Sequence, residues 1–355
     1  MQNLIKNAPE LKELVTFVPN KIEPIHNWYY YKEGFSKKFV EWCIDKFGIT
    51  NKHVVLDQFC GVGTTPLTCK QHGIKSIGFD CSPLCTFVSR VKTTDYDLEE
   101  LEEVKNEVLS WSPEKSDVPN NNWLKIAFNK KVLEDIISYK KRLFSMKNED
   151  TRNFMILALM NASMMSSYVE KDGAFLKVKK KHVPPLKKAF DYSVKKMFKE
   201  YSKSNIPNTE VRIDVCDARD LDLKDKSVDF IITSPPYLNK IEYTQIYRTE
   251  YALFFDQPKT RIHSAIENEE EHYFNDMRKV IEEMKRVCKG KVAVVIGGGC
   301  FPDRVVEVDR SFARLAEQVG WKVDDILVAR NSWCTRSKVM KVARMRESVI
   351  LLSSE

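Results

Sequence analysis

Residues 53–80 read HVVLDQFCGVGTTPLTCKQHGIKSIGFD, and this stretch decides the fold. Its first six residues, centred on the apolar Val54, Val55 and Leu56, predict a short buried strand. A glycine-containing loop and a helix over residues 66–72 follow it. Gly73 marks the end of that helix, and a second strand over residues 76–80 ends at Asp80. The order strand, loop, helix, strand is typical of the first unit of a parallel α/β sheet.

The rest of the chain extends this sheet and interrupts it once. After a helix that begins at Ser82, residues 95–205 show helical periodicity, which predicts a helical insertion. The pattern then predicts strands over residues 211–215, 228–233, 291–296, 322–329 and 347–352 and a helix over residues 305–318. We therefore expect an α/β fold made of a lead-in (1–27), a first sheet half (28–94), the insertion (95–205) and a second sheet half (206–355).

Composition narrows the class of protein. Hydrophobic residues make up 43% of the chain, which fits a soluble globular protein, and the net charge of +7 favours a polyanionic partner such as nucleic acid. The nine cysteines form no CxxC pair and no zinc spacing, so we expect no metal and free thiols in a reducing cytoplasm. No apolar run approaches 18 residues and no signal peptide is evident, which predicts a cytoplasmic protein without a membrane span.

The loop after the first strand has the features of a cofactor site. Gly61 and Gly63 let the backbone approach a ligand closely, and the helix that follows offers free N–H groups to a carboxylate. Asp57 could accept hydrogen bonds from a ligand ammonium group, and Asp80 could bind ribose hydroxyls. The third glycine of a dinucleotide motif is absent, since Pro66 stands there, so a nicotinamide site is disfavoured. S-adenosylmethionine carries both the carboxylate and the ribose that this loop suits.

A second strand ends in an unusual loop, Thr233-Ser234-Pro235-Pro236-Tyr237. The two prolines fix φ and remove two backbone donors, so the loop is stiff. Such a loop would hold the Ser234 hydroxyl, the Pro235 carbonyl and the Tyr237 ring in one geometry. The two oxygens could accept hydrogen bonds from an exocyclic amine of a base, while the ring stacks on a base pulled out of its helix. Methyl transfer from a sulfonium needs this positioning more than a strong base.

Together these two loops resemble a known family. Ser234-Pro235-Pro236-Tyr237 resembles the catalytic tetrapeptide of the amino-methyltransferases, and Phe59-Cys60-Gly61-Val62-Gly63 resembles their F-x-G-x-G cofactor motif. The resemblance covers residues 28–94 and 211–352. It implies a Rossmann-like class I methyltransferase fold with a mostly parallel sheet of the seven-stranded type. It also implies S-adenosylmethionine as cofactor, double-stranded DNA as partner and a cognate restriction endonuclease encoded alongside.

The resemblance also assigns roles to particular residues. Ser234, Pro235, Pro236 and Tyr237 would be catalytic. The loop from Asp57 to Thr65 would surround the methionine moiety, Cys81 and Ser82 would flank the adenine, and residues 31–36 would close over the methionine end. The implied cofactor-binding residues are Lys32, Gly34, Phe35, Asp57, Phe59, Cys60, Gly61, Gly63, Thr64, Thr65, Asp80, Cys81, Ser82, Asp217 and Ala218.

The target of methylation stays open between several acceptors. Serine in the first position of the tetrapeptide resembles the cytosine-N4 branch, whereas adenine-N6 enzymes more often carry Asp there, and RNA or protein enzymes Asn or Asp. Adenine-N6 and RNA therefore remain alternatives. Cytosine-C5 chemistry is disfavoured because the chain has no Pro-Cys dipeptide. A non-catalytic nucleic-acid binder of the same fold is a further alternative, against which the intact motifs argue.

Basic and aromatic residues outside the motifs are candidates for nucleic-acid contact. No large separate region follows Tyr237, so target recognition must come from the insertion, the loop after Tyr237 or the basic tail over residues 330–346. The candidates are Lys177, Lys179, Lys180, Lys181, Asn239, Tyr243, Arg248, Arg330, Arg336 and Lys338. The alternatives are a solvated basic loop around Lys177, a packing stripe of tyrosines around Tyr243, and a solvated hairpin in the tail.

Overall fold

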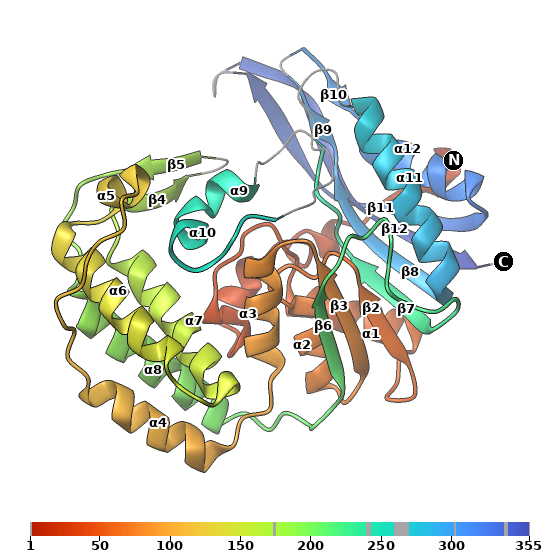
Figure 1. The fold of residues 1–355 in the computed structure, drawn as a ribbon. Coiled ribbons are helices and arrows are strands. Elements are labelled where there is room, and N and C mark those ends of the chain that lie inside the picture. Colours follow the sequence, from red (N-terminus) through yellow and green to blue (C-terminus); the bar gives the residue numbers. More distant parts are fainter. Residues whose placement is uncertain are drawn as a thin grey trace.

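A computed structural model describes residues 2–172, 175–238, 243–258, 270–301, 303–336 and 340–354. Its centre is an eight-stranded sheet in the order β1-β11-β12-β8-β7-β2-β3-β6 (Figure 1). The strands are β1 Ile5–Asn7, β2 Val54–Asp57, β3 Lys75–Asp80, β6 Val211–Val215, β7 Val228–Thr233, β8 Cys288–Gly297, β11 Trp321–Arg336 and β12 Met340–Ser354.

The pairing of these strands is parallel except at β12. Strands β6, β3, β2, β7 and β8 pair in parallel, whereas β12 runs antiparallel to both of its neighbours, β8 and β11. The predicted mostly parallel sheet is thus confirmed. Because the carboxyl ends of β2, β3 and β7 meet at one edge, the loops predicted to bind cofactor and substrate lie next to each other.

Helices cover both faces of the sheet, as the residue pattern along β8 requires. Val292, Val294 and Ile296 pack under α11 (Glu270–Val287) and α12 (Val308–Gln318), while Ala293 and Val295 face α1 (Lys37–Phe47). Strand residues alternate between faces, so a strand covered on both sides is apolar throughout. Helices α2 (Thr64–Gln71) and α3 (Pro83–Thr93) follow β2 and β3.

The insertion is helical, as predicted, but it also contains a β-hairpin. Its helices are α4 Leu98–Ser110, α5 Asn122–Ala127, α6 Lys130–Phe144, α7 Glu149–Met165 and α8 Leu186–Ser202. The region around Lys177, for which a solvated basic loop was one interpretation, contains the strands β4 (Val169–Asp172) and β5 (Phe175–Val178).

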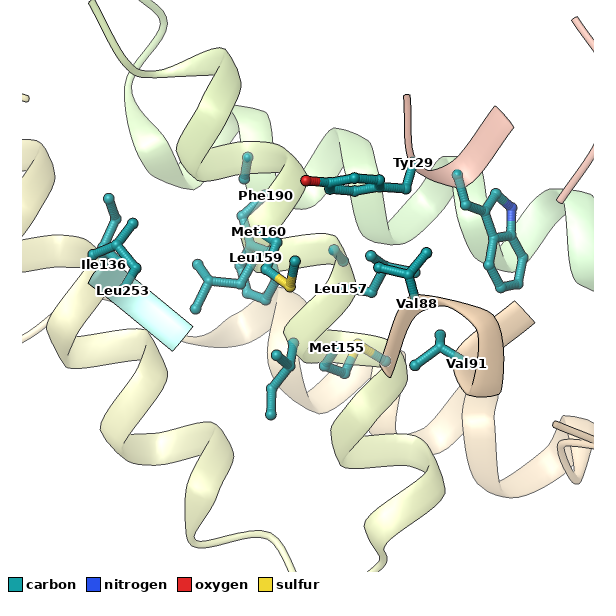
Figure 2. Close-up of a cluster of buried hydrophobic side chains, with 14 of the residues drawn as sticks. Tyr29, Val88, Val91, Ile136, Met155, Leu157, Leu159, Met160, Phe190 and Leu253 are labelled. Carbon is teal, nitrogen blue, oxygen red and sulfur yellow. The ribbon is translucent and has the colours of Figure 1, made fainter. Parts of the chain in front are cut away.

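Figure 2 shows that the core of the insertion is shared with the sheet domain. Met160 and Phe190 of the insertion belong to the same cluster as Tyr29 and Val88, and Leu253 joins it from α10 (Arg248–Phe254). Helix α7 is buried on nearly all sides, which explains its apolar composition. The insertion therefore packs directly on the elements that carry the site.

Three expectations need correction. The lead-in contributes strand β1 and buries Leu11 and Val15 under the sheet, so it belongs to the folded body. The predicted helix over residues 305–318 begins only at Val308, after the short strand β10 (Val305–Val306), which pairs with β9 (Gly299–Cys300). Strands β11 and β12 extend 16 and 15 residues and form a long hairpin beyond the sheet.

The cysteines also differ from the prediction of free thiols throughout. Cys300 and Cys334 form a disulfide with their Cα atoms 5.6 Å apart, which joins β9 to β11. Within the described ranges, no helix is long and apolar enough to cross a membrane. The same residues contain no group of three or more His, Cys, Asp or Glu side chains that could hold a metal ion.

Candidate functional site

A pocket at the carboxyl edge of the sheet brings the two predicted loops together. Among the predicted residues it is lined by Gly34, Phe35, Asp57, Phe59, Cys60, Gly61, Thr64, Asp80, Cys81, Ser82, Ser234, Pro236 and Tyr243. Gly61 and Ser234 are far apart in sequence but line the same cavity. The lining does not include Lys32, Gly63, Thr65, Asp217, Ala218, Pro235 and Tyr237.

The glycine loop has the predicted backbone. Gly61 and Gly63 adopt positive φ of 49° and 81°, and Gly63 is the N-cap of α2 without a side-chain hydrogen bond to its first turn. Thr64, the first residue of that helix, lines the pocket, and the backbone N–H groups at the start of a helix suit a carboxylate. A Cβ at Gly63 would lie 3.0 Å from the Cα of Ser89, so the loop packs directly on α3.

Asp57 has a structural role beyond the one predicted. Its carboxylate accepts hydrogen bonds from Thr233 Oγ1 at 2.6 Å, Thr65 Oγ1 at 2.7 Å and the Phe59 backbone N–H at 3.1 Å. Burial raises the pKa of Asp57 to about 6, against the effect of these donors. Asp57 therefore ties the cofactor loop to the strand that carries the Ser-Pro-Pro-Tyr loop. Its contact with a ligand ammonium group stays a prediction.

Asp80 ends β3 and lines the pocket, and its contact with ribose hydroxyls stays a prediction. Its Oδ2 accepts from the Gly61 backbone N–H at 3.0 Å and its Oδ1 from the Ser82 N–H at 2.9 Å. Each oxygen keeps a further lone pair that could accept from a ligand hydroxyl. Burial raises the pKa of Asp80 to about 6. Ser82 caps α3 and hydrogen-bonds to the hydroxyl of Tyr251 at 2.7 Å.

The pair Asp217 and Ala218 lies outside the pocket lining. Arg219 binds the Asp217 carboxylate twice, at 2.7 and 2.9 Å, and also binds Asp276 at 2.8 Å. Ala218 is buried in the core. The contact of this pair with an adenine amine stays a prediction.

Residues 31–36 close one end of the pocket. The Asn20 amide donates to the Phe35 carbonyl at 3.2 Å and to Thr64 Oγ1 at 3.4 Å, which holds the segment over the start of α2. Glu33 lines the pocket but was not among the predicted residues. It accepts a hydrogen bond from the Tyr247 hydroxyl at 2.6 Å, and burial raises its pKa. Lys32 lies beside Glu33, 3.7 Å away, rather than in the lining.

The Ser-Pro-Pro-Tyr loop is anchored at several points. The Pro236 carbonyl accepts from the Tyr273 hydroxyl at 2.9 Å, and the Tyr237 hydroxyl donates to Glu347 Oε1 at 2.7 Å. A Cβ at Gly297 would lie 2.5 Å from the Tyr237 ring, so the ring lies directly over β8. Ser234 and Pro236 face the pocket. Stacking of Tyr237 on a base stays a prediction.

The predicted nucleic-acid residues have varied environments. Lys177, Lys179 and Lys180 lie exposed on or just after β5, and Lys181 pairs with Glu170 at 2.7 Å. Arg248 stacks on Trp123 at 4.2 Å, and Arg330 pairs with Glu347. Tyr243 lines the pocket together with Tyr247 and Tyr251, two buried rings of the predicted packing stripe. Asn239 and Lys338 lie outside the described residues, as does the side chain of Arg336.

Sequence comparison relates the chain to named methyltransferases. It is 32% identical over 289 residues to the type II methyltransferase M.BsoBI of Geobacillus stearothermophilus, covering 70% of the chain and 57% of that relative. It is 26% identical over 273 residues to the type II methyltransferase M.AvaI of a Nostoc strain, covering 68% of the chain and 56% of that relative. The chain thus spans little more than half the length of these relatives. No model of a known protein family matches it.

The solved structures that match the chain are more distant in sequence. An SAM-dependent methyltransferase of Methanosarcina mazei matches with a TM-score of 0.34 and 10% identity over 88% of the chain and 96% of that structure. A geranyl diphosphate C-methyltransferase of Streptomyces coelicolor matches with a TM-score of 0.36 and 9% identity over 90% of the chain and 80% of that structure.

Two features define the class of protein. They are the strand order, with its one antiparallel strand β12, and the pocket at the glycine loop. The chain has the Rossmann-like class I methyltransferase fold, and S-adenosylmethionine is its cofactor. By sequence it is a relative of the type II methyltransferases. The residues present fit the cofactor, since an uncapped helix end, a pocket-facing acid at Asp80 and a closing segment over residues 31–36 surround one cavity.

Proposed function

We propose that the chain methylates the exocyclic N4 amine of cytosine in double-stranded DNA, with the target base flipped out of the helix. The observation that carries this proposal is the shared pocket. Ser234 and Pro236 line the same cavity as Gly61 and Asp80, so a substrate amine at Ser234 would face a cofactor held by the glycine loop. The serine in place of an acid is the reason for preferring cytosine.

In this mechanism the chain mainly orients the reactants. S-adenosylmethionine, held by the glycine loop and Asp80, would supply an electrophilic methyl group at this point of the pocket. Ser234 Oγ and the Pro235 carbonyl accept hydrogen bonds from the amine, which turns its lone pair toward the methyl group, and the proton that the methylated nitrogen loses passes to solvent water. The prolines and the bond from Tyr273 to the Pro236 carbonyl keep these acceptors in place before the substrate arrives.

Two hairpins carry exposed basic and aromatic residues, which favours duplex DNA as the substrate. The β4–β5 hairpin and the outer part of the β11–β12 hairpin lie on either side of α9 (Tyr243–Ile246) in Figure 1, at the carboxyl edge of the sheet. The first presents lysines 177, 179 and 180 and an exposed Phe175. The second presents Trp333, over which Arg344 stacks at 5.5 Å. Mixed basic and aromatic surfaces of this kind suit a nucleic acid.

The first hairpin is also connected to the pocket. Lys171 of β4 pairs with the buried Glu250 of α10 at 2.7 Å and lies 3.9 Å from the centre of the Tyr247 ring. Tyr247 lines the pocket and binds Glu33. A nucleic acid bound at the hairpin would therefore lie next to the cavity that receives the base, and we assign target recognition in part to the insertion.

Methyl transfer from labelled S-adenosylmethionine to defined nucleic acids tests the proposal. We expect label in duplex DNA, and mass spectrometry of the digested nucleosides should show N4-methylcytosine. N6-methyladenine instead would move the target to adenine, and label in structured RNA alone would refute DNA as the substrate. Cofactor binding without transfer to any nucleic acid would favour a non-catalytic binder.

Lysines 179 and 180 should contribute to DNA affinity without affecting the cofactor. Replacement of both by alanine removes two cationic contacts, so we expect weaker DNA binding and a salt dependence reduced by about two in the log–log slope. Fluorescence anisotropy across a salt series measures both quantities. Lys322→Ala at the start of β11, at the opposite edge of the sheet, is the control and should leave the slope unchanged. An unchanged slope in the double variant would remove this hairpin from the DNA interface.

Cofactor affinity should fall as the pH drops through about 6. The carboxylate of Asp80, whose pKa is about 6, loses its capacity to accept from two ribose hydroxyls once it is protonated. Affinity should therefore be constant above neutral pH and weaken by up to about tenfold per pH unit below 6. Calorimetric titration from pH 5 to 8 measures this. Asp80→Asn should bind weakly at pH 8 and lose part of the pH dependence, and a wild-type profile in that variant would contradict the assignment.

A further inference from the structure

Glu33 lines the pocket although no sequence motif singled it out. Its side chain is only 4% exposed, and its Oε2 accepts the hydrogen bond from the Tyr247 hydroxyl at 2.6 Å. Among the described residues, no donor hydrogen-bonds to its Oε1. Lys32 Nζ lies 3.7 Å from this oxygen, which is too far for a hydrogen bond. A buried carboxylate oxygen without a donor is costly, so Glu33 is prepared for a donor that a ligand brings.

The charge of the pocket favours a cationic group on that ligand. Three acids line the pocket, Glu33, Asp57 and Asp80, and the described residues of its lining include no Lys, Arg or His. Burial raises the pKa of all three carboxyl groups, and a cation bound among them would stabilise their ionised forms. S-adenosylmethionine has two positive centres, the α-ammonium group and the sulfonium.

The position of Glu33 favours the ammonium group of the two. The cofactor carboxylate suits the start of α2, and the ammonium group is bonded to the same carbon atom as that carboxylate. Its acceptor must therefore lie close to the start of α2. The segment over residues 31–36 is held over this helix end, and a Cβ at Gly61 in the glycine loop would lie 3.3 Å from the Tyr31 ring.

Asp57, the ammonium acceptor that the sequence suggests, is less suited to this role. Both of its oxygens already accept hydrogen bonds from the protein, and the residue is 1% exposed. Glu33 Oε1 accepts none from the described residues. Glu33 is therefore the acid of the pocket with an oxygen left for the ligand.

A lysine of the insertion fixes the tyrosine that binds Glu33. Lys171 of β4 has its Nζ 3.9 Å from the centre of the Tyr247 ring and pairs with Glu250 at 2.7 Å. The Tyr247 ring also stacks on Tyr31, with 5.1 Å between the ring centres. These contacts hold the Tyr247 hydroxyl at Glu33 Oε2 before any ligand binds.

We infer that Glu33 accepts a hydrogen bond from the ammonium group of S-adenosylmethionine, and that Lys171 and Tyr247 are positioning residues that hold Glu33 in place. The inference concerns cofactor binding alone and does not depend on which acceptor is methylated. It gives the insertion a part in binding the cofactor, in addition to its proposed part in target recognition.

S-adenosylhomocysteine and its analogue with hydrogen in place of the α-amino group test the assignment, because the two ligands differ only in that group. Glu33→Gln removes the negative charge with little change of shape. We expect calorimetry to give about tenfold weaker binding of S-adenosylhomocysteine and less than about twofold weaker binding of the analogue. Equal losses for both ligands would overturn the inference. So would weaker binding of S-adenosylmethionine alone, which would place Glu33 beside the sulfonium.

Asp80→Asn is the matched control for Glu33→Gln. Asp80 also lines the pocket, but it ends β3, where the ribose is expected. This variant should weaken the binding of both ligands by the same factor. If its loss of affinity depended on the amino group as strongly as that of Glu33→Gln, the effect would come from the total charge of the pocket, and the assignment to Glu33 would be wrong.

Lys171→Met tests the positioning role, with Lys105→Met as its control. Lys105 of α4 also pairs with an acid, Glu102 at 2.6 Å, and also lies over an aromatic ring, that of Phe198 at 4.0 Å. Lys171→Met should weaken the binding of S-adenosylhomocysteine about three- to fivefold and leave that of the analogue unchanged. Lys105→Met should bind both ligands as the wild type does.

A double variant shows whether the lysine acts through Glu33. Lys171→Met added to Glu33→Gln should cause no further loss of affinity for S-adenosylhomocysteine. Losses that multiply would overturn the positioning role. The calorimetric stoichiometry gives the fraction of folded molecules in each variant, so a variant that is partly unfolded still yields the affinity of its folded form.

Discussion

Replacement of Ser234 by alanine is expected to lower the single-turnover rate of methyl transfer about a hundredfold or more. In this variant the amine loses a preorganised acceptor, and removal of one such group from an active site typically lowers kcat by about 10²–10³. Ser234 faces the pocket from a loop that is anchored through Thr233, Pro236 and Tyr237, so no other side chain of the loop can replace its oxygen. Rapid-quench measurements with labelled cofactor and excess enzyme give this rate directly.

Ser234→Thr is the matched control for the alanine variant. Threonine keeps the hydroxyl and adds one methyl group, so its rate should lie between those of wild type and Ser234→Ala. Calorimetry should give the same S-adenosylmethionine affinity for all three proteins, because the cofactor contacts come from the glycine loop and Asp80. A Ser234→Ala variant that transfers methyl groups at the wild-type rate would exclude Ser234 from the mechanism.

The parts of the fold that depend on local pattern were predictable. The apolar run before Asp57, the glycines of the loop and the acid at Asp80 are contiguous in sequence, and β2, α2 and β3 form close to where they predict. The β4–β5 hairpin was missed because each of its strands has only four residues, too few to give a clear alternating pattern, and because a long-range pair, Lys171 with Glu250, holds β4. The lead-in was missed because its strand of three residues is too short to give a pattern.

Sequence motifs predicted many of the residues that line the pocket. They did not predict contacts between side chains that are far apart in the sequence. Glu347 stands beside no recognisable motif, and Glu33 lies in the segment over residues 31–36 without being singled out there. Their contacts are with Tyr237 and Tyr247, 110 and 214 positions away. Arg330 was assigned to DNA because the tail over residues 330–346 is basic, yet its cross-strand partner is an acid. For Asp217 the sequence does indicate a partner for the carboxylate, since an arginine two residues later can bind it.

Replacement of Gly63 by alanine is expected to reduce both cofactor binding and stability. The residue has φ of +81°, which costs a non-glycine residue about 1–2 kcal/mol. The new Cβ would also lie 3.0 Å from the Ser89 backbone, so either the loop or α3 must move. Overpacking of this kind costs a further 1–3 kcal/mol, roughly. Because this loop and α3 border the pocket, we expect S-adenosylmethionine affinity to fall at least about tenfold and the free energy of unfolding to fall by about 3 kcal/mol.

Gly73→Ala separates the cost of the positive φ from the cost of the close contact with α3. Gly73 follows the same helix with φ of +69°, but an added Cβ would meet no atom within 4 Å. The free energy of unfolding of this variant, measured in denaturant, should therefore fall only by the cost of the positive φ, about 1–2 kcal/mol. Its affinity for the cofactor should equal that of the wild type. If Gly63→Ala and Gly73→Ala lost equal stability and both kept full affinity, the close approach of the loop to α3 would have no part in forming the cofactor site. Unequal losses, with weakened binding in Gly63→Ala alone, would place the requirement for glycine in the packing of loop against helix as much as in its backbone angle.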